Sequence, residues 1–315
     1  MKIQIYGAGI AGSYLYYLLS GRLEVGIVDR RSEPDCRCGW GIYYSEAREL
    51  YGRIGIDFDR YVLCKPRYLI VNNVRFRNMM VSFDRKHLLE DLWREIEFKS
   101  LDNPDLIIDA TGYERAFLPK IENDSLYYTI QMLEVHECEE NIYIYSSRFG
   151  YAWAIPLSNN RWHIGAGGVS EEYCRKLLNN LRIQYGFKAR EPICMCKARV
   201  RLLPPSRCKP IINGKVVGVG EAIGCVSGFG EGNTPSLKSA LILSECILNN
   251  ALERYEEEIS REFKWIELEH EFVRAVQEGN KVKTLKLLPK VLKIEGRRLF
   301  KPTLETFIAY LKQKL

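Results

Sequence analysis

Three glycines near the start of the chain have the spacing of a phosphate-binding turn. Gly7, Gly9 and Gly12 follow residues 2–6, which predict a short strand, and precede the apolar helical stretch 13–19. A second predicted strand, 25–28, ends at Asp29. Such glycines let the backbone approach a pyrophosphate at a helix N-terminus, and the acid accepts hydrogen bonds from a ribose 2′-hydroxyl. The segment therefore predicts a βαβ unit that binds a dinucleotide.

Three later segments also carry chemistry-bearing residues at the ends of predicted elements. Asp84 and Arg85 open a predicted helix, and the apolar strand 106–109 runs into Ala110, Thr111 and Gly112. Small residues after a buried strand are expected where backbone passes close to a ligand. A further strand, 215–220, leads to Glu221 and then to the Gly-rich segment 228–233.

The remaining elements must position these segments. Helices are predicted over 45–52, 87–95, 171–184 and 236–248, and mostly helical structure from 251 onward. Residues 62–83 alternate as strands do, 96–98 predict a short strand, and 126–168 predict an antiparallel sheet. We expect an α/β fold with a Rossmann-type dinucleotide-binding domain (1–112 and 205–250). An interleaved antiparallel β-sheet substrate domain (113–204) and a helical, basic C-terminal region (251–315) complete it.

Composition limits the class of protein. The chain has 315 residues, 46% of them hydrophobic and 27% charged, which excludes global disorder. It contains no run of about twenty apolar residues. Because residue 2 already enters a strand and no basic-then-apolar leader precedes it, we expect a cytoplasmic protein.

The cysteines and histidines indicate no metal or triad. Ten cysteines in a long chain without a signal peptide favour reduced thiols. Two Cys-x-Cys pairs, Cys36/Cys38 and Cys194/Cys196, do not have the usual spacing of zinc ligands, so we expect no metal. The histidines show no ligand or triad spacing and are interpreted as structural: His87, His136, His163 and His270.

Together these segments resemble the flavoprotein group of geranylgeranyl reductases, aromatic hydroxylases and flavin-dependent halogenases, over about residues 1–260. Two stretches are similar to the geranylgeranyl reductase branch in particular. Cys38-Gly39-Trp40-Gly41 is similar to its Cys-Gly loop beside the flavin. Residues 150–156, Gly-Tyr-Ala-Trp-Ala-Ile-Pro, followed by a Gly-Ala-Gly turn at 165–167, are similar to its Tyr-x-Trp-x-Phe-Pro strand.

The resemblance implies an FAD cofactor and names its contacts. Gly7, Gly9 and Gly12 would hold the pyrophosphate, Asp29 the adenosine ribose, and Arg85 would place a cation near the phosphates. Glu221 stands where the group usually has an Asp on the ribityl chain. The cofactor contacts implied by the resemblance are Gly7, Ala8, Gly9, Gly12, Asp29, Arg30, Cys38, Gly39, Arg85, Thr111, Gly112, Glu221, Gly230, Gly232 and Asn233.

The same resemblance implies catalytic contacts from Cys38, Tyr151 and Trp153. Tyr151 and Trp153 lie two residues apart in a predicted strand, so both side chains can line one wall of an isoprenoid pocket. Without the family, a plain aromatic core pair is the alternative for these two residues. Cys38 is open between a functional thiol and an inert small hydrophobe. No proton donor can be named.

The implied activity is reduction of isoprenoid double bonds by hydride transfer from reduced flavin. The electron donor is open between ferredoxin and NAD(P)H, because the chain has one dinucleotide fingerprint. A monooxygenase or halogenase is the first alternative, since Ile155-Pro156 is the halogenase pattern. A non-catalytic paralogue that binds FAD or a lipid is the second, because the chain is short between Arg85 and Asp109.

The C-terminal region carries the basic excess. Residues 281–315 contain ten Lys or Arg and two Glu, a local charge of +8, against +6 for the whole chain. Lysines interleave with leucines around Pro289. This pattern suits an anionic membrane surface or a prenyl phosphate, with an ordinary amphipathic helix as the alternative. No aromatic-studded basic groove accompanies the charge, so we expect no nucleic-acid partner.

Overall fold

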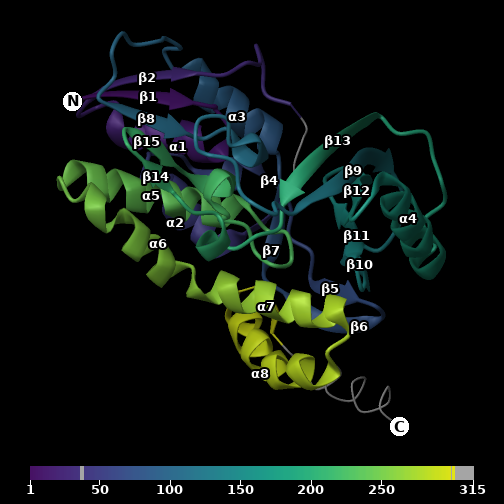
Figure 1. The fold of residues 1–315 in the computed structure, drawn as a ribbon. Coiled ribbons are helices and arrows are strands. Elements are labelled where there is room, and N and C mark those ends of the chain that lie inside the picture. Colours follow the sequence, from purple (N-terminus) through teal and green to yellow (C-terminus); the bar gives the residue numbers. More distant parts are fainter. Residues whose placement is uncertain (36–38, 299, 302–315) are drawn as a thin grey trace.

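A five-stranded sheet forms the N-terminal layer of the computed structural model, which describes residues 1–35, 39–298 and 300–301 (Figure 1). Its strand order is β14-β15-β8-β1-β2. Four strands run parallel, and β14 is antiparallel to β15. The strands are β1 (Lys2–Tyr6), β2 (Glu24–Val28), β8 (Leu106–Asp109), β14 (Ile212–Asn213) and β15 (Val216–Gly218).

The strands of this sheet are apolar because their side chains are buried in the core. Ile3 and Ile5 of β1, Ile27 of β2 and Ile108 of β8 are fully buried, as apolar strands covered on both faces are. Parallel pairing brings the carboxyl ends of β1, β2, β8 and β15 to one edge, where the predicted site segments follow. The strand predicted at 96–98 is wrong, since only a single bridge joins Phe98 to Ile27.

Helices pack on this sheet and on one another. They are α1 (Ile10–Leu19), α2 (Tyr44–Gly52), α3 (Arg85–Arg94) and α5 (Asn233–Leu248). α1 packs against α5 and α3. Tyr14 in α1 donates a hydrogen bond to the carbonyl of Leu50 in α2 at 2.8 Å, which fixes these helices around the fully buried Tyr51.

A larger sheet of eight strands forms the second layer. Its order is β13-β9-β12-β11-β10-β5-β6-β16, antiparallel throughout except for the parallel pair β10 and β5. Helix α4 (Glu171–Tyr185) covers one face, at the outer side of the molecule in Figure 1. The strands are β5 (Tyr68–Val71), β6 (Val74–Asn78), β9 (Leu126–Val135), β10 (Ile142–Ser147), β11 (Gly150–Pro156), β12 (Arg161–Gly168), β13 (Cys194–Arg201) and β16 (Phe300–Lys301).

A small sheet connects the two layers. It has the order β3-β7-β4, with β3 (Gly41–Tyr43), β7 (Met80–Phe83) and β4 (Val62–Cys64). Ser82 of β7 donates to the carbonyl of Pro156 in β11 at 2.6 Å and so ties it to the eight-stranded sheet. Short 3-10 turns complete the connections: η1 (Phe58–Tyr61), η2 (Gly112–Glu114), η3 (Pro205–Arg207), η4 (Gly220–Ile223) and η5 (Leu252–Arg254).

The described part of the C-terminal region is helical apart from the short strand β16, in agreement with the prediction. Helices α6 (Tyr255–Glu262), α7 (Lys264–Glu278) and α8 (Lys281–Arg298) follow one another, and β16 then pairs with β6. Figure 1 shows α7 and α8 along the lower side of the molecule, with α7 beside β5 and β6. In the described ranges, no helix has both the length and the apolar character needed to cross a bilayer.

The turn predicted at 165–167 is wrong. Gly165 lies in the middle of β12, paired with Trp153 of β11. A Cβ at position 165 would run into the indole of Trp153, so glycine here makes room for a ring that lies flat across the neighbouring strand. Glycine therefore marks a close packing contact rather than a chain reversal.

Candidate functional site

The turn between β1 and α1 contains three glycines. Two of them are required by close backbone packing, and the third borders open space. Gly7 has φ +100°, and a Cβ there would collide with the carbonyl of Ala110. A Cβ on Gly12 would collide with the carbonyl of Gly7. A Cβ on Gly9, by contrast, would meet no atom within 4 Å. No side chain caps α1, so no cap competes with a pyrophosphate for the N–H groups of its first turn.

Asp29 lies beside this turn at the end of β2. Its carboxylate accepts hydrogen bonds from the amide of Ala8 at 2.7 Å and from the backbone and guanidinium of Arg31 at 2.8–2.9 Å. Burial raises its pKa, but these hydrogen bonds outweigh burial and hold the pKa below its usual value. The four bonds fill the acceptor positions of the carboxylate, so a ribose hydroxyl at Asp29 must share them with Arg31 or displace it.

Arg31 is the cation that pairs with Asp29. Its guanidinium lies 5.5 Å from the centre of the Trp93 ring. Arg30, predicted as a cofactor contact, instead forms an ion pair with Glu114 at 2.6 Å and is 62% exposed. The sequence reasoning missed Arg31, although its spacing of two residues from Asp29 allows the bidentate pair.

Arg85 is buried at the first turn of α3. It is 5% exposed, so it is not a solvated charge on the helix surface. Asp84 caps the helix by accepting from the amide of His87 at 3.0 Å. Burial raises the pKa of Tyr51, and the charge of Arg85 opposes this rise, which places the guanidinium near the Tyr51 phenol. Arg85 is therefore a buried cation close to α2.

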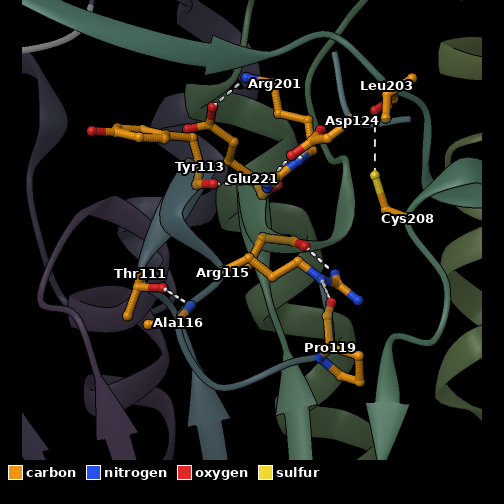
Figure 2. A network of polar contacts seen from close by, with 11 residues as sticks. Thr111, Tyr113, Arg115, Ala116, Pro119, Asp124, Arg201, Leu203, Cys208 and Glu221 are labelled. Carbon is orange, nitrogen blue, oxygen red and sulfur yellow. Dashed lines mark hydrogen bonds and ion pairs between the residues drawn. The ribbon is translucent and has the colours of Figure 1, made fainter. Parts of the chain in front are cut away.

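Asp109 fixes the segment that follows β8. It is fully buried and accepts from the amide and hydroxyl of Thr111 and from the amides of Phe117 and Leu118. The Thr111 hydroxyl in turn accepts from the amide of Ala116 at 2.9 Å (Figure 2). Gly112 then takes a left-handed conformation with φ +69°. The predicted contacts Thr111 and Gly112 are thus held rigidly by a residue outside the predicted set.

Glu221 lies in a polar network with Arg201 and Asp124 (Figure 2). One carboxylate oxygen accepts from the amide of Arg201 at 2.7 Å, and the other lies 3.5 Å from where a Cβ on Gly112 would be. Burial raises the pKa of Glu221 to about 7, opposed by the Arg201 hydrogen bond and charge. The extra methylene relative to Asp lets this carboxyl reach the end of β13.

Arg201 holds Glu221 from the other sheet. Its buried guanidinium pairs with Asp124 at 2.8 Å and donates to the carbonyl of Tyr113 at 2.7 Å (Figure 2). Arg115 lies next to this network and donates hydrogen bonds to the carbonyls of Pro119, Pro210 and Ala222. Sequence reasoning missed Arg115, Asp124 and Arg201, because most of their partners are distant in sequence.

The loop before α5 brings Asn233 to Gly39. The Asn233 side-chain amide donates to the carbonyls of Gly39 and Gly41, each at 3.2 Å. Within the described part of the chain, the N–H groups of residues 231–233 have no acceptor. Gly230 in this loop has φ +86°. The arrangement fits an anionic or carbonyl group at the N-terminus of α5. Cys38, expected beside Gly39, lies outside the described residues.

An aromatic wall on β11 and β12 reaches this loop. Tyr151 and Trp153 share one face of β11, with ring centres 5.5 Å apart. The Trp153 indole donates to Nδ1 of His163 at 3.1 Å, and the His163 ring is nearly parallel to the ring of Trp40 at 5.9 Å. Burial lowers the pKa of His163 to about 3, so the imidazole is neutral. Sequence reasoning left His163 and Trp40 out of the site.

Buried carboxyls lie behind the loop. Glu269 of α7 is fully buried and accepts from the amide of Gly228 at 3.0 Å. Burial and the neighbouring Glu269 carboxyl raise the pKa of Glu295 in α8. Glu231 accepts from the amide of Thr234 at 2.8 Å and lies 3.7 Å from Arg298. Among the described residues, no group of three or more His, Cys, Asp or Glu side chains could hold a metal ion.

Comparison with known proteins gives one sequence relative and several structures. No protein-family model matches the chain. MJ1182, an uncharacterized protein of Methanocaldococcus jannaschii, is 23% identical over 359 residues, spanning 91% of this chain and 94% of that protein.

The solved structures match over most of the chain. A geranylgeranyl bacteriochlorophyll reductase-like protein from Thermoplasma acidophilum has TM-score 0.71 at 16% identity, covering 94% of this chain and 98% of its own. A flavoprotein/dehydrogenase from Cytophaga hutchinsonii has TM-score 0.68 at 15% identity, covering 93% and 92%. A tryptophan 6-halogenase from Streptomyces toxytricini has TM-score 0.63 at 14% identity, covering 86% and 77%. The predicted fold class is confirmed: the chain shares the fold of a geranylgeranyl reductase-like protein, a flavoprotein dehydrogenase and a tryptophan halogenase.

Proposed function

We propose that this chain is an FAD-dependent oxidoreductase that reduces carbon–carbon double bonds of an isoprenoid lipid. One observation carries the proposal. The loop at the N-terminus of α5 and the aromatic wall of β11 meet where the Tyr151 hydroxyl lies against Gly230. A ring cofactor bound at that loop would therefore face aromatic side chains.

The residues present fit FAD. The open space at Gly9, together with the uncapped N-terminus of α1, accommodates a pyrophosphate. Glu221, beside Gly112, offers a carboxyl to hydroxyl groups of a ribityl chain. The amides of residues 231–233 would receive the polar edge of the flavin, where the dipole of α5 favours negative charge.

Reduced flavin, when bound, supplies the hydride for an isolated alkene. The chain supplies burial and orientation. Trp153 and His163 are 8% and 4% exposed, and the neutral imidazole places no charge beside an apolar chain. Ile155 and Met80 extend the same apolar cluster around Trp153. An alkene held against this wall would be shielded from water, which suits hydride transfer.

The similarity to a geranylgeranyl bacteriochlorophyll reductase-like protein supports the isoprenoid substrate. The tryptophan 6-halogenase among the similar structures supports the alternative of an oxygen-using enzyme. The two chemistries differ in their need for oxygen. A reductase adds two hydrogen atoms per double bond without oxygen, whereas a monooxygenase or halogenase consumes oxygen with the reduced cofactor.

Product analysis tests the proposal. The FAD-loaded protein, dithionite and a geranylgeranyl lipid are incubated with and without oxygen, and the lipid is examined by mass spectrometry. We expect products heavier by two hydrogen atoms per reduced bond in the absence of oxygen. An oxygenated or halogenated product formed only with oxygen would overturn the proposal.

A further inference from the structure

Helix α8 has an exposed apolar strip opposite the side that packs on the body. Leu287, Val291 and Glu295 form its buried side. Val282, Leu285 and Leu292 are 80%, 55% and 44% exposed. With Pro289, these residues recur at helical spacing, so they line one strip of the helix surface. Apolar side chains gathered in this way differ from singly scattered surface residues.

Basic side chains run beside this strip. Lys286, Lys290, Lys293 and Arg297 are exposed and also recur at helical spacing. Lys283 is already paired with Glu271 of α7 at 2.9 Å. No ion pair between described residues involves Lys286, Lys290 or Lys293. The acid within α8, Glu295, is buried on the opposite side, so it does not offset these charges at the surface.

We propose that this face of α8, comprising the apolar strip and the adjacent lysines, binds the surface of an anionic lipid bilayer. Leucine and valine side chains enter the boundary between headgroups and acyl chains, while lysines reach outward to lipid phosphates along their own apolar stems. The positive charge of the lysines on this face favours an anionic bilayer over other binding partners. A second copy of the chain would bring the same lysines together, and an uncharged surface would leave them without counter-charge. The inference depends neither on flavin nor on turnover.

The face is accessible in the fold. Figure 1 places α8 at the lower side of the molecule, away from the five-stranded sheet. Packing of α8 against α7 uses the buried side, which includes the carboxyl of Glu295 beside Glu269. Docking therefore requires no rearrangement of the helix pair.

Vesicle co-sedimentation of the full chain tests the proposal. Vesicles of phosphatidylglycerol and phosphatidylcholine in equal parts are compared with phosphatidylcholine alone, at low and high salt. We expect binding to the anionic vesicles only, weakened by salt. The triple variant Lys286→Gln, Lys290→Gln, Lys293→Gln is expected to bind about 100-fold more weakly, at about fivefold per lysine. The double variant Val282→Ser, Leu285→Ser is expected to lose at least about tenfold.

A charge-matched control separates a specific face from total charge. Lys120, Lys176 and Lys188 are exposed on other elements, and their triple change to Gln removes the same charge. We expect this variant to bind as the parent does. Equal loss in both triples, equal binding to neutral vesicles, or no binding to any vesicle would overturn the proposal. Sedimentation velocity without lipid tests self-association, and a concentration-dependent dimer lost only in the α8 triple would assign the face to a second copy instead.

Discussion

The hydroxyl of Tyr151 occupies the space that a side chain at position 230 would fill. A Cβ on Gly230 would lie 2.5 Å from the Tyr151 oxygen, and the backbone there has φ +86°. Burial and, to a smaller extent, the charge of Glu231 raise the pKa of Tyr151 to about 12, so the phenol keeps its proton. The eight-stranded sheet thus contacts the loop before α5 through a neutral hydroxyl.

This contact predicts a measurable coupling between positions 151 and 230. Gly230→Ala is expected to lower the free energy of unfolding by about 1–2 kcal/mol for the left-handed backbone, plus about 1–3 kcal/mol for the collision. Adding Tyr151→Phe should recover most of the cost of the collision, because it removes the hydroxyl. Denaturant unfolding of both single variants and the double variant measures the coupling. Gly186→Ala, with φ +75° and open space, isolates the backbone cost. Additive effects at 151 and 230 would contradict the contact.

Gly9→Val is expected to abolish FAD binding while leaving the fold intact. A Cβ at position 9 meets no protein atom within 4 Å, and the valine side chain would occupy the approach to the N-terminus of α1. Flavin fluorescence titration measures the loss, and thermal unfolding of the free protein measures the fold. Gly21→Val also enters open space and serves as the control. A Gly9→Val protein that still takes up FAD would show that the turn does not bind the pyrophosphate.

Trp153→Phe is expected to reduce lipid turnover while FAD stays bound. The change keeps an aromatic ring but removes the donor to His163, with an expected cost of about 1–3 kcal/mol in stability. Trp162→Phe is the matched control, because that indole also loses a buried hydrogen bond, to the carbonyl of His136, in the core beneath α4. Both variants should be destabilised similarly. Equal turnover in the two variants would return Trp153 to a purely structural role.

Stability should fall as pH rises through the carboxyl pair of α7 and α8. The folded pKa of Glu295 is raised above the ordinary value of 4.5 by burial and by Glu269, with Arg298 opposing and Glu231 adding to the rise. A raised folded pKa stabilises the fold below the unfolded pKa, and this contribution is lost as pH rises through the folded pKa. Glu295→Gln removes that titration and keeps a donor toward Glu269.

Unfolding free energies measured from about pH 5 to pH 9 test this prediction. The parent should lose stability relative to Glu295→Gln across this range, with Glu278→Gln on the exposed side of α7 as the control. Glu221, whose pKa is raised by burial to about 7, titrates in both proteins and cancels in the comparison. Glu231 raises the pKa of Glu295, so its titration belongs to the measured difference. Parallel profiles for the parent and Glu295→Gln would show that the pair does not titrate in the fold.

Local pattern was sufficient for the N-terminal unit. The glycine spacing, the apolar strands and Asp29 predict the βαβ unit because each signal lies within a few residues of the next. The same pattern could not decide between Arg30 and Arg31, because the turn after β2 determines which side chain faces Asp29. The sequence pattern at 165–167 predicts a turn. A glycine that makes room for an aromatic ring on the neighbouring strand looks the same in sequence as a glycine in a chain reversal.

The rest of the site depends on contacts between distant segments. Arg201 reaches Glu221 and Asp124 only after β13 has joined the sheet, and Glu269 meets Glu295 only after α7 and α8 have paired. His163 gives no ligand signal in sequence, yet pairing of β11 with β12 places it at Trp153. The cytoplasmic location, the domain boundaries and the electron donor stay predictions.

Anaerobic single turnover shows whether reduced flavin in this protein gives its hydride to an isoprenoid double bond. The protein is loaded with FAD and reduced with dithionite, and its absorption spectrum is followed after a geranylgeranyl lipid is added without oxygen. We expect the bands of oxidised flavin to return in step with saturation of the lipid. Flavin that stays reduced until oxygen is admitted, or a protein that takes up no FAD, would contradict it.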